Sequence, residues 1–257
     1  MIALVTGASS GIGAATARRL AAEPDARLVL VARRRDRLDA LAAELGGATV
    51  IAADLLDEAT PKLIADRVES EHGRLDLVVN SAGVGGRGTF AKSGWAEVER
   101  TMAINFDAQV RLAEAVLPLL RRSAPSAIVF IGSVASRVSR ARAGSYSASK
   151  FALAGWTEAL YMEERRHGVH VALVQPGFVA TEGFPQRELL ARPWTRWMVS
   201  TDDKVAEAVV EAWRRRQAER YVPRPYGLVP VARTLLPGLY RRVVGGGAFT
   251  PSLRRQD

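Results

Sequence analysis

Six short apolar runs, each followed by a stretch with helical spacing, constrain the fold of this chain more than any other feature. The runs lie at residues 2–6, 27–32, 48–54, 75–83, 126–133 and 169–177. Strands that are apolar on both faces are buried on both faces, as in parallel sheets covered by helices. The sequence therefore predicts an α/β fold in which a doubly wound parallel sheet is flanked by helices.

The 257 residues are predicted to form one domain, because no linker and no repeat of fixed period interrupts this alternation. Ligands of such sheets bind beyond the carboxyl ends of the strands, so we expect the functional site there. Two segments are expected to add to the domain. They are a substrate lid at residues 182–200 and a C-terminal extension at residues 221–257.

Composition argues against several other classes of protein. The chain has no cysteine and its three histidines lack the spacing of metal ligands, so we expect no metal. The net charge is +9, but the basic clusters are not interleaved with stacking aromatics, so we expect no nucleic-acid partner. No run approaches the roughly 18 apolar residues of a membrane span, and the first strand leaves no room for a signal peptide. We therefore expect a cytoplasmic protein.

The first predicted strand runs into the glycine-rich turn "TGASSGIG" at residues 6–13. Glycines let a backbone approach a phosphate, and the N–H groups that begin the following helix point at the anion. The GxxxGxG spacing differs from the commoner GxGxxG, and a tight turn with a packing glycine is the alternative. The candidate cofactor contacts in this turn are Gly7, Ser9, Ser10, Gly11, Ile12 and Gly13.

The end of the second predicted strand indicates which dinucleotide binds. An acidic residue there holds the ribose 2′-hydroxyl, whereas an arginine accommodates a 2′-phosphate. This chain has Arg33 and Arg34 and no carboxylate at that place. Charge-assisted hydrogen bonds from Arg33 to the phosphate predict NADP(H) in preference to NAD(H). A solvated helix start is the alternative.

Further cofactor contacts are predicted at the ends of the third and fourth strands. Asp54, with Leu55 beside it, can accept a hydrogen bond from an adenine amino group, or it can be a helix N-cap. The segment "NSAG" places small residues where a cofactor must pass, and its candidates are Asn80, Ala82 and Gly83. Neither signal is specific when it is taken alone.

Tyr146 and Lys150 stand four residues apart in "YSASK", so both project from one face of a helix. A tyrosine hydroxyl has a pKa near 10, and a neighbouring ammonium favours the phenolate. Tyr146 is thus a candidate proton donor and acceptor, although the pair alone also fits a surface tyrosine beside a lysine. Ser133 ends a strand and can hydrogen-bond a substrate oxygen. Asn105 can order a water behind the lysine.

The motifs "TGASSGIG", "NSAG", "GSVAS", "YSASK" and "PGFVAT" occur in this order at the ends of the predicted strands. Together they closely resemble those of the short-chain dehydrogenase/reductase family in its short single-domain form, over roughly residues 1 to 215. The resemblance implies a Rossmann-type sheet of about seven parallel strands and a nicotinamide cofactor. It makes Tyr146 the general acid/base and makes Lys150 the residue that binds the nicotinamide ribose and lowers the pKa of the tyrosine. Ser133 positions the reacting oxygen, and Asn105 sustains a proton relay.

The resemblance also implies a reaction. Pro176, Gly177, Val179 and Thr181 match the segment that holds the nicotinamide carboxamide. The expected chemistry is hydride transfer between the nicotinamide and a small-molecule carbonyl compound or secondary alcohol. A non-catalytic NADP(H)-binding sensor or scaffold of the same fold is the alternative function. We further expect a homodimer or a homotetramer. The one departure from the family pattern is Ser81, where the commoner motif reads "NNAG", and this is a tolerated variation.

Substrate choice is expected to lie in the predicted lid, which mixes bulky apolar residues with arginines. These residues are Phe184, Arg187, Arg192, Trp194, Arg196, Trp197 and Met198. Apolar walls suit a lipid-like or aromatic carbonyl compound, and arginines suit an acyl carboxylate or a phosphate. A flexible lid that packs on the body is the alternative. Arg137, Arg140 and Arg142 either rim the mouth of the site or face solvent.

The C-terminal extension carries an approximate helical stripe that Pro230 and Pro237 interrupt. The stripe consists of Leu228, Val231, Leu235, Leu236, Leu239 and Val243. Packing on the body or on a neighbouring subunit is the favoured interpretation. A peripheral membrane contact aided by arginines and a cover for the substrate pocket are the alternatives.

Overall fold

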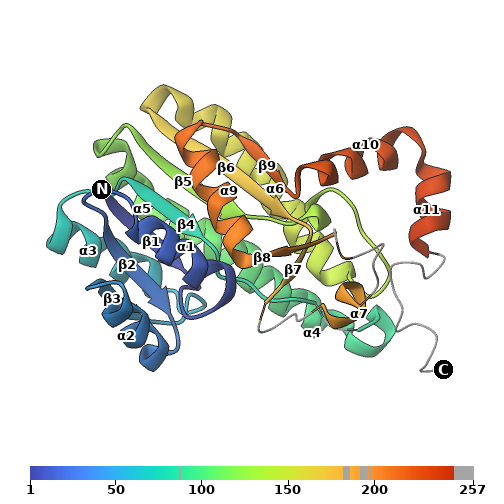
Figure 1. The fold of residues 1–257 in the computed structure, drawn as a ribbon, viewed down its shortest axis with the longest axis horizontal. Coiled ribbons are helices and arrows are strands. Elements are labelled where there is room, and N and C mark those ends of the chain that lie inside the picture. Colours follow the sequence, from blue (N-terminus) through green and yellow to red (C-terminus); the bar gives the residue numbers. More distant parts are fainter. Residues whose placement is uncertain (87, 182–185, 192–195, 197, 246–257) are drawn as a thin grey trace.

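The computed structural model of the chain describes residues 1–86, 88–181, 186–191, 196 and 198–245. Its centre is a seven-stranded sheet in the order β3-β2-β1-β4-β5-β6-β9 (Figure 1). All six strand pairings are parallel. The strands are β1 (Ile2–Thr6), β2 (Arg27–Ala32), β3 (Thr49–Ala52), β4 (Leu77–Asn80), β5 (Ser126–Ile131), β6 (Val169–Pro176) and β9 (Glu219–Val222).

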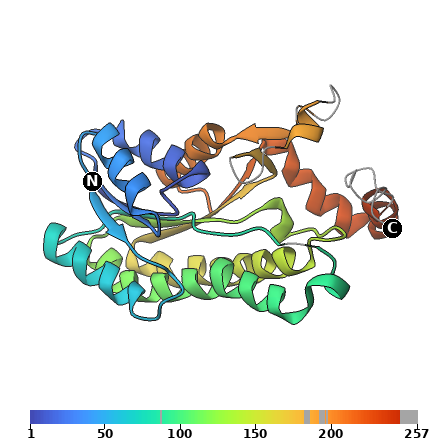
Figure 2. The ribbon, with the colours of Figure 1, turned by 90° about the horizontal axis from the view of Figure 1, so that it is seen from below.

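Helices cover both faces of the sheet, as Figure 2 shows edge-on. The principal helices are α1 (Gly11–Ala21), α2 (Arg35–Glu44), α3 (Thr60–His72), α4 (Phe90–Met102), α5 (Ala108–Arg122), α6 (Gly144–Glu164) and α9 (Asp202–Arg214). One apolar core joins the sheet to α1, α2 and α9, and a second joins its other face to α3, α5 and α6. The predicted α/β fold with a doubly wound parallel sheet is confirmed.

The central strands are buried along their whole length because both of their faces are covered. All five residues of β1, all six of β5 and all eight of β6 are buried. The strand order reverses between β1 and β4, so the helices that follow these two strands lie on opposite faces of the sheet. A crevice at the carboxyl ends beside such a switch point is where ligands bind in folds of this kind.

Several short elements lie beyond the carboxyl edge of the main sheet. The segment that follows β6 forms β7 (Phe178–Ala180), which pairs in parallel with β8 (Val199–Thr201). The remaining short elements of this region are the π-helix η1 (Ala103–Asp107), the 3₁₀ helix η2 (Val134–Ser136) and α7 (Arg187–Leu190). Of the residues singled out in the predicted lid, Phe184, Arg192, Trp194 and Trp197 lie outside the described residues.

The chain after β9 forms the 3₁₀ helix η4 (Arg224–Gly227), α10 (Leu228–Leu235) and α11 (Pro237–Gly245). Pro230 lies in the first turn of α10 and Pro237 begins α11, positions at which a helix tolerates proline. The two prolines therefore begin helices rather than break one. Figure 1 shows that α10 and α11 project from the body beyond β9. No helix within the described ranges has the length and hydropathy needed to cross a bilayer.

Candidate active site

The turn between β1 and α1 requires glycine at three positions. Gly7 and Gly11 have φ angles of +67° and +52°, in the left-handed region that favours glycine. A Cβ on Gly13 would lie 2.3 Å from the carbonyl oxygen of Gly7, so the start of α1 packs directly on the turn. Ser10 precedes α1 with no side-chain cap, which leaves the first N–H groups of the helix without that partner. The turn has the features of an anion cradle, as a dinucleotide phosphate requires.

Basic side chains border this turn at the end of β2. The Arg34 guanidinium donates hydrogen bonds to the Ser9 and Ser10 hydroxyls, at 3.0 and 2.7 Å. Arg33 is 70 % exposed, and its Nη1 lies 3.8 Å from the Asp54 carboxylate. The sequence motif thus places the Arg34 guanidinium against the turn and the Arg33 guanidinium beside Asp54.

Asp54 and Leu55 are arranged differently from a helix start. Asp54 Oδ1 accepts a hydrogen bond from the backbone N–H of Leu56 at 3.1 Å. Because α3 does not begin until Thr60, Asp54 closes a turn and is not the N-cap of that helix. The Leu55 side chain is buried in the core, so only its backbone is available to a ligand.

The segment after β4 is held by two residues that the sequence reasoning missed. Thr6 Oγ1, at the end of β1, accepts hydrogen bonds from the backbone N–H groups of Ser81 and Ala82, both at 3.1 Å. Gln109 on α5 donates from Nε2 to the Ala82 carbonyl at 3.0 Å. Asn80 is fully buried, and its amide atoms have no partner among the described residues. Threonine and glutamine occur in many structural positions, so nothing in the sequence distinguishes Thr6 and Gln109 as residues that hold this segment.

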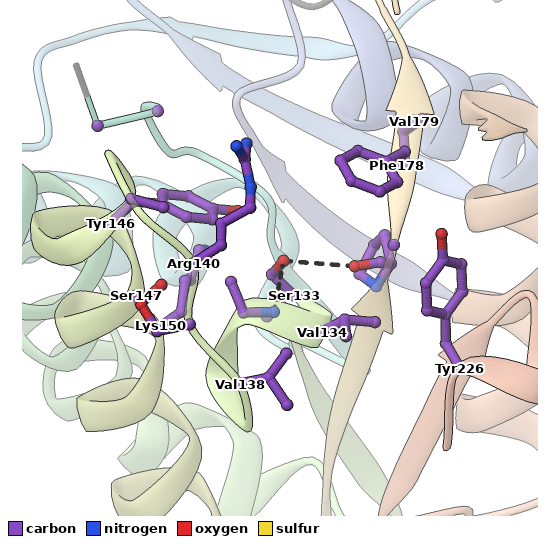
Figure 3. A pocket seen from close by; sticks show the side chains of 18 of the residues that line it. Ser133, Val134, Val138, Arg140, Tyr146, Ser147, Lys150, Phe178, Val179 and Tyr226 are labelled. Atoms are coloured by element: carbon purple, nitrogen blue, oxygen red, sulfur yellow. Dashed lines mark hydrogen bonds between the residues drawn. The ribbon is translucent and has the colours of Figure 1, made fainter. Parts of the chain in front are cut away.

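Ser133 lies directly beyond the end of β5, where it forms the N-cap of η2. Its Oγ accepts a hydrogen bond from Ala135 N at 3.1 Å and donates to the Pro176 carbonyl at 3.4 Å. Ser136 completes a capping box by accepting from Ser133 N. The hydroxyl is therefore fixed at the junction of β5 and β6, facing the cavity in Figure 3.

Tyr146 and Lys150 lie one turn apart on α6, as their spacing predicts. Lys150 is 4 % exposed, its Nζ donates to the Ile131 carbonyl at 2.7 Å, and burial lowers its pKa to about 8. The distance from Nζ to the centroid of the Tyr146 ring is 6.0 Å. Burial raises the pKa of Tyr146, while a hydrogen bond with Ser133 and the charge of Arg140 act to lower it.

The charge of Arg140 thus opposes the rise of the Tyr146 pKa that burial causes. The predicted lowering by Lys150 stays a prediction. Arg140 lies on the loop between η2 and α6 and extends beside Tyr146 over the cavity (Figure 3). Its guanidinium has no hydrogen bond or ion pair with another of the described residues, although its backbone carbonyl accepts from Ala143 N at 3.2 Å. Its own pKa is lowered by burial and raised by Tyr146. Of the three arginines expected either at the mouth or in solvent, Arg140 and Arg142 line the cavity.

Asn105 connects the loop after β4 to the helix that carries the tyrosine. It lies in the π-helix η1 and is fully buried. Its Oδ1 accepts from Val84 N at 2.8 Å, and its Nδ2 donates to Val84 O at 2.9 Å and to Ser149 Oγ at 3.0 Å. Ser149 Oγ in turn donates to the Tyr146 carbonyl at 2.8 Å. A π-turn often marks a functional position in a helix, and here it aims an amide at two separate segments.

A cavity of about 420 Å³ lies beyond the carboxyl ends of β4, β5 and β6. The predicted site residues that line it are Ile12, Gly83, Ser133, Tyr146, Lys150, Pro176, Gly177, Val179 and Thr181. The remaining predicted residues do not line it: Gly7, Ser9, Ser10, Gly11, Gly13, Arg33, Arg34, Asp54, Leu55, Asn80, Ala82 and Asn105. Most of these follow the carboxyl ends of β1 to β4, where the longer part of a dinucleotide would extend.

The outer wall of the cavity is apolar and comes largely from segments that the motifs do not include. Its residues are Val134, Val138, Phe178, Met198, Tyr226, Val229, Tyr240 and Val244. The Tyr226 ring packs on Gly177, where a Cβ would lie 2.4 Å from the ring. The Tyr226 hydroxyl donates to the Met198 carbonyl at 3.0 Å. The "PG" of the fifth motif thus makes room for a tyrosine that lies about fifty residues further along the chain.

Comparison with known proteins identifies the family. A family model described as short chain dehydrogenase matches residues 1–189. The chain is 33 % identical over 220 residues to the ketoacyl reductase HetN of Nostoc sp., covering 84 % of this chain and 76 % of that protein. The chain therefore belongs to the short-chain dehydrogenase/reductase family of oxidoreductases, as the motifs predict.

Two solved structures extend the similarity to nearly the whole chain. A short-chain dehydrogenase of Burkholderia cenocepacia in complex with NADP is 31 % identical, with a TM-score of 0.77 and coverage of 85 % of this chain and 94 % of that one. A short-chain dehydrogenase of Sphingobium yanoikuyae in complex with NADPH is 32 % identical, with a TM-score of 0.76 and coverage of 92 % and 95 %. Both similar proteins hold a 2′-phosphorylated cofactor.

The packing of Gly13 predicts the effect of adding one methyl group. We expect Gly13→Ala to lower the free energy of unfolding by about 1–3 kcal/mol and to weaken dinucleotide binding, because its Cβ would overlap the Gly7 carbonyl. Chemical denaturation and NADPH titration measure the two effects. Gly155→Ala is the matched control, since α6 has open space there. Equal stability of the two variants would contradict the close approach.

The buried ammonium of Lys150 predicts a dependence of stability on pH. Its pKa is about 8 in the folded protein against 10.5 for a free lysine, so the unfolded chain binds more protons between these values. Stability from this group therefore rises with pH across that window. Relative to Lys150→Met, the wild-type protein should gain about 3 kcal/mol between about pH 7 and about pH 11. Lys204→Met, at an exposed lysine, is the control, and a parallel pH profile for Lys150→Met would refute the shift.

Proposed function

We propose that the protein is an NADP(H)-dependent oxidoreductase that transfers a hydride between the nicotinamide and a carbonyl compound or secondary alcohol. The observation that carries the proposal is the convergence of Ser133, Tyr146 and Lys150 on one cavity at the carboxyl edge of the sheet. The family relationship and the two similar structures with NADP or NADPH support it. A sensor or scaffold that only binds the cofactor does not need these three side chains around a substrate-sized space.

The cofactor would lie along the carboxyl ends of β1 to β4. The glycine turn would hold its diphosphate, and Arg33 and Arg34 would pair with the 2′-phosphate. Asp54 and the segment from Asn80 to Gly83 would border its adenosine and ribose parts. The segment from Pro176 to Thr181 would hold the carboxamide. The bound nicotinamide supplies or accepts the hydride, and the protein supplies the geometry and the proton.

Tyr146 moves the proton in this proposal. Its raised pKa keeps the phenol protonated at neutral pH, so it is ready to donate to a carbonyl oxygen as that oxygen gains negative charge. The Ser133 hydroxyl hydrogen-bonds the same oxygen and fixes its position. Lys150 binds the ribose hydroxyls, and the charge of Arg140 favours the phenolate that donation leaves behind. Asn105 holds the loop after β4 against α6 and has acceptor capacity left on Oδ1 for a water in the relay.

The cavity wall indicates the class of substrate. Most of its outer residues are apolar, whereas Arg140 brings a charge close to the reacting end. These features favour a carbonyl compound with a sizeable apolar group. Gln186 and Met198, two described residues of the 182–200 segment, line the cavity and support the proposal that this segment is a substrate lid.

Replacement of the acid/base tests the mechanism. We expect Tyr146→Phe to lower kcat by about 10²–10⁴-fold with a panel of ketones and NADPH, followed at 340 nm, while NADPH affinity stays nearly constant. Tyr161→Phe, on the same helix but partly buried against the core and away from the cavity, is the matched control. If Tyr146→Phe keeps full turnover, the proton role is excluded. If the wild-type protein binds NADPH but turns over no ketone or alcohol of a broad panel, that result favours the alternative of a non-catalytic sensor or scaffold.

Replacement of the two arginines tests the choice of cofactor. We expect Arg33→Asp/Arg34→Ala to weaken NADPH binding at least about tenfold and to leave NADH binding unchanged or stronger, because the 2′-phosphate loses its cations. Fluorescence titration with each cofactor measures the ratio. Arg35→Ala is the control, since Arg35 lies next in sequence but pairs with Asp39. If the ratio of NADPH affinity to NADH affinity is unchanged in the double variant, these two arginines do not determine the preference for NADP(H).

A further inference from the structure

The C-terminal helices carry a concentration of exposed apolar side chains. We define the C-terminal apolar face as Leu228, Val231, Leu235, Leu236, Leu239 and Val243, whose exposed fractions range from 43 % to 71 %. These six are half of the twelve large apolar side chains that are exposed among the described residues, and they occupy only 16 consecutive positions. A clustered apolar surface of this kind usually marks an interaction site.

The C-terminal apolar face is exposed although α10 and α11 are packed against the body of the protein. The opposite side of the same helices packs on the body, where Val229, Tyr240 and Val244 line the cavity. The Tyr240 hydroxyl donates to the Ser139 carbonyl at 2.8 Å. Arg233 donates to the Arg137 carbonyl at 2.9 Å. Because one side of the pair is fixed on the body, the other side is held outward.

Apart from Asp257, the charged residues of the C-terminal extension are all of one sign. No acidic residue occurs in the sequence between Glu219 and Asp257, whereas arginines stand at positions 220, 224, 233, 241, 242, 254 and 255. Arg241 and Arg242 are exposed and have no ion-pair partner within the part of the chain that the structure describes. The apolar face is therefore flanked by positive charge without a compensating carboxylate of its own.

This charge pattern selects between the possible partners. In a symmetric dimer each face would meet a copy of itself, so arginines would face arginines with no acid between them. An anionic lipid surface instead offers negative headgroups to the arginines and acyl chains to the leucines and valines. Helices of eight and nine residues are much shorter than the about 20 residues that span a bilayer, so they suit the interface.

We propose that α10 and α11 bind the interface of an anionic lipid bilayer, with the C-terminal apolar face in the acyl region and Arg241 and Arg242 at the headgroups. Of the three sequence-based interpretations of this segment, the structure thus favours the membrane contact, with the opposite side of the helices serving as a wall of the pocket. A bound protein would hold this wall, with Val229, Tyr240 and Val244, next to the lipid. An apolar substrate would then enter from the bilayer, a consequence that rests on the proposed function. Membrane binding itself does not.

Vesicle flotation tests the proposal without any measurement of turnover. We expect the full-length protein to float with phosphatidylcholine vesicles that contain about 30 % phosphatidylglycerol, and at least about tenfold less with pure phosphatidylcholine. Binding should weaken in about 0.5 M salt, because screening shortens the reach of the arginines. Equal binding to both kinds of vesicle, or binding to neither, would overturn the proposal.

Two pairs of substitutions separate the apolar and the charged contributions. Leu235→Glu/Leu239→Glu should abolish flotation, and Arg241→Glu/Arg242→Glu should remove the preference for the anionic vesicles. None of these four residues lines the cavity, so the variants should keep the thermal stability of the parent. Leu63→Glu/Met162→Glu is the matched control, because these residues are similarly exposed on other helices. That control should float like the parent protein.

A second copy of the chain is the competing occupant, and light scattering in the absence of lipid detects it. If Leu235→Glu/Leu239→Glu reduces an oligomer to a smaller species while neither protein floats, the face is a subunit interface and the proposal is wrong. If both proteins float equally, the apolar face is not the membrane contact, and the proposal is equally wrong. Unchanged mass together with loss of flotation supports it.

Discussion

The hydrogen bond from the Lys150 ammonium to the Ile131 carbonyl is the interaction on which the geometry of the site depends. It joins α6 to the last residue of β5 and places a buried cation at the edge of the sheet. Since Tyr146 lies one turn earlier on the same helix and Ser133 lies two residues beyond Ile131, this single contact brings both hydroxyls to one cavity. Burial of the ammonium is costly to stability, which is typical of a site that function has shaped.

Three cations among the described residues line the cavity, and two of them, Lys150 and Arg140, lie near Tyr146. The buried Lys150 is directed to a backbone carbonyl and has a lowered pKa, whereas Arg140 approaches the phenol from the open side of the cavity. A guanidinium remains charged at every pH at which proteins fold, so Arg140 is a more constant source of field than Lys150. A spacing of four residues identifies two side chains that lie near each other only when both are on the same helix. An arginine six residues before Tyr146, on a loop, therefore gives no such signal.

The sequence predicts the sheet, the glycine turn and the candidate catalytic side chains because each of them depends on local spacing or on strand ends. The parallel pairing of β1 with β4 then brings Gly7 against the segment after β4, where a Cβ on Gly7 would lie 3.0 Å from the Ala82 backbone. The outer wall of the cavity is different, since Tyr226 on Gly177 and Tyr240 on Ser139 are contacts between distant segments. The two C-terminal prolines suggest interruptions in a stripe, and only the packing shows that they begin helices. The direction in which the apolar face points is likewise a tertiary property.

Tyr226 links parts of the molecule that have separate roles. Its ring rests on the backbone of Gly177, its hydroxyl holds Met198 at the start of β8, and η4, which contains it, runs directly into α10. The C-terminal helices are consequently connected to the segment that follows β6 through this aromatic ring, in addition to the contacts of Tyr240 with Ser139 and of Arg233 with Arg137. The position of those helices therefore bears directly on the shape of the space above Ser133, because Tyr226, Val229, Tyr240 and Val244 line the same cavity.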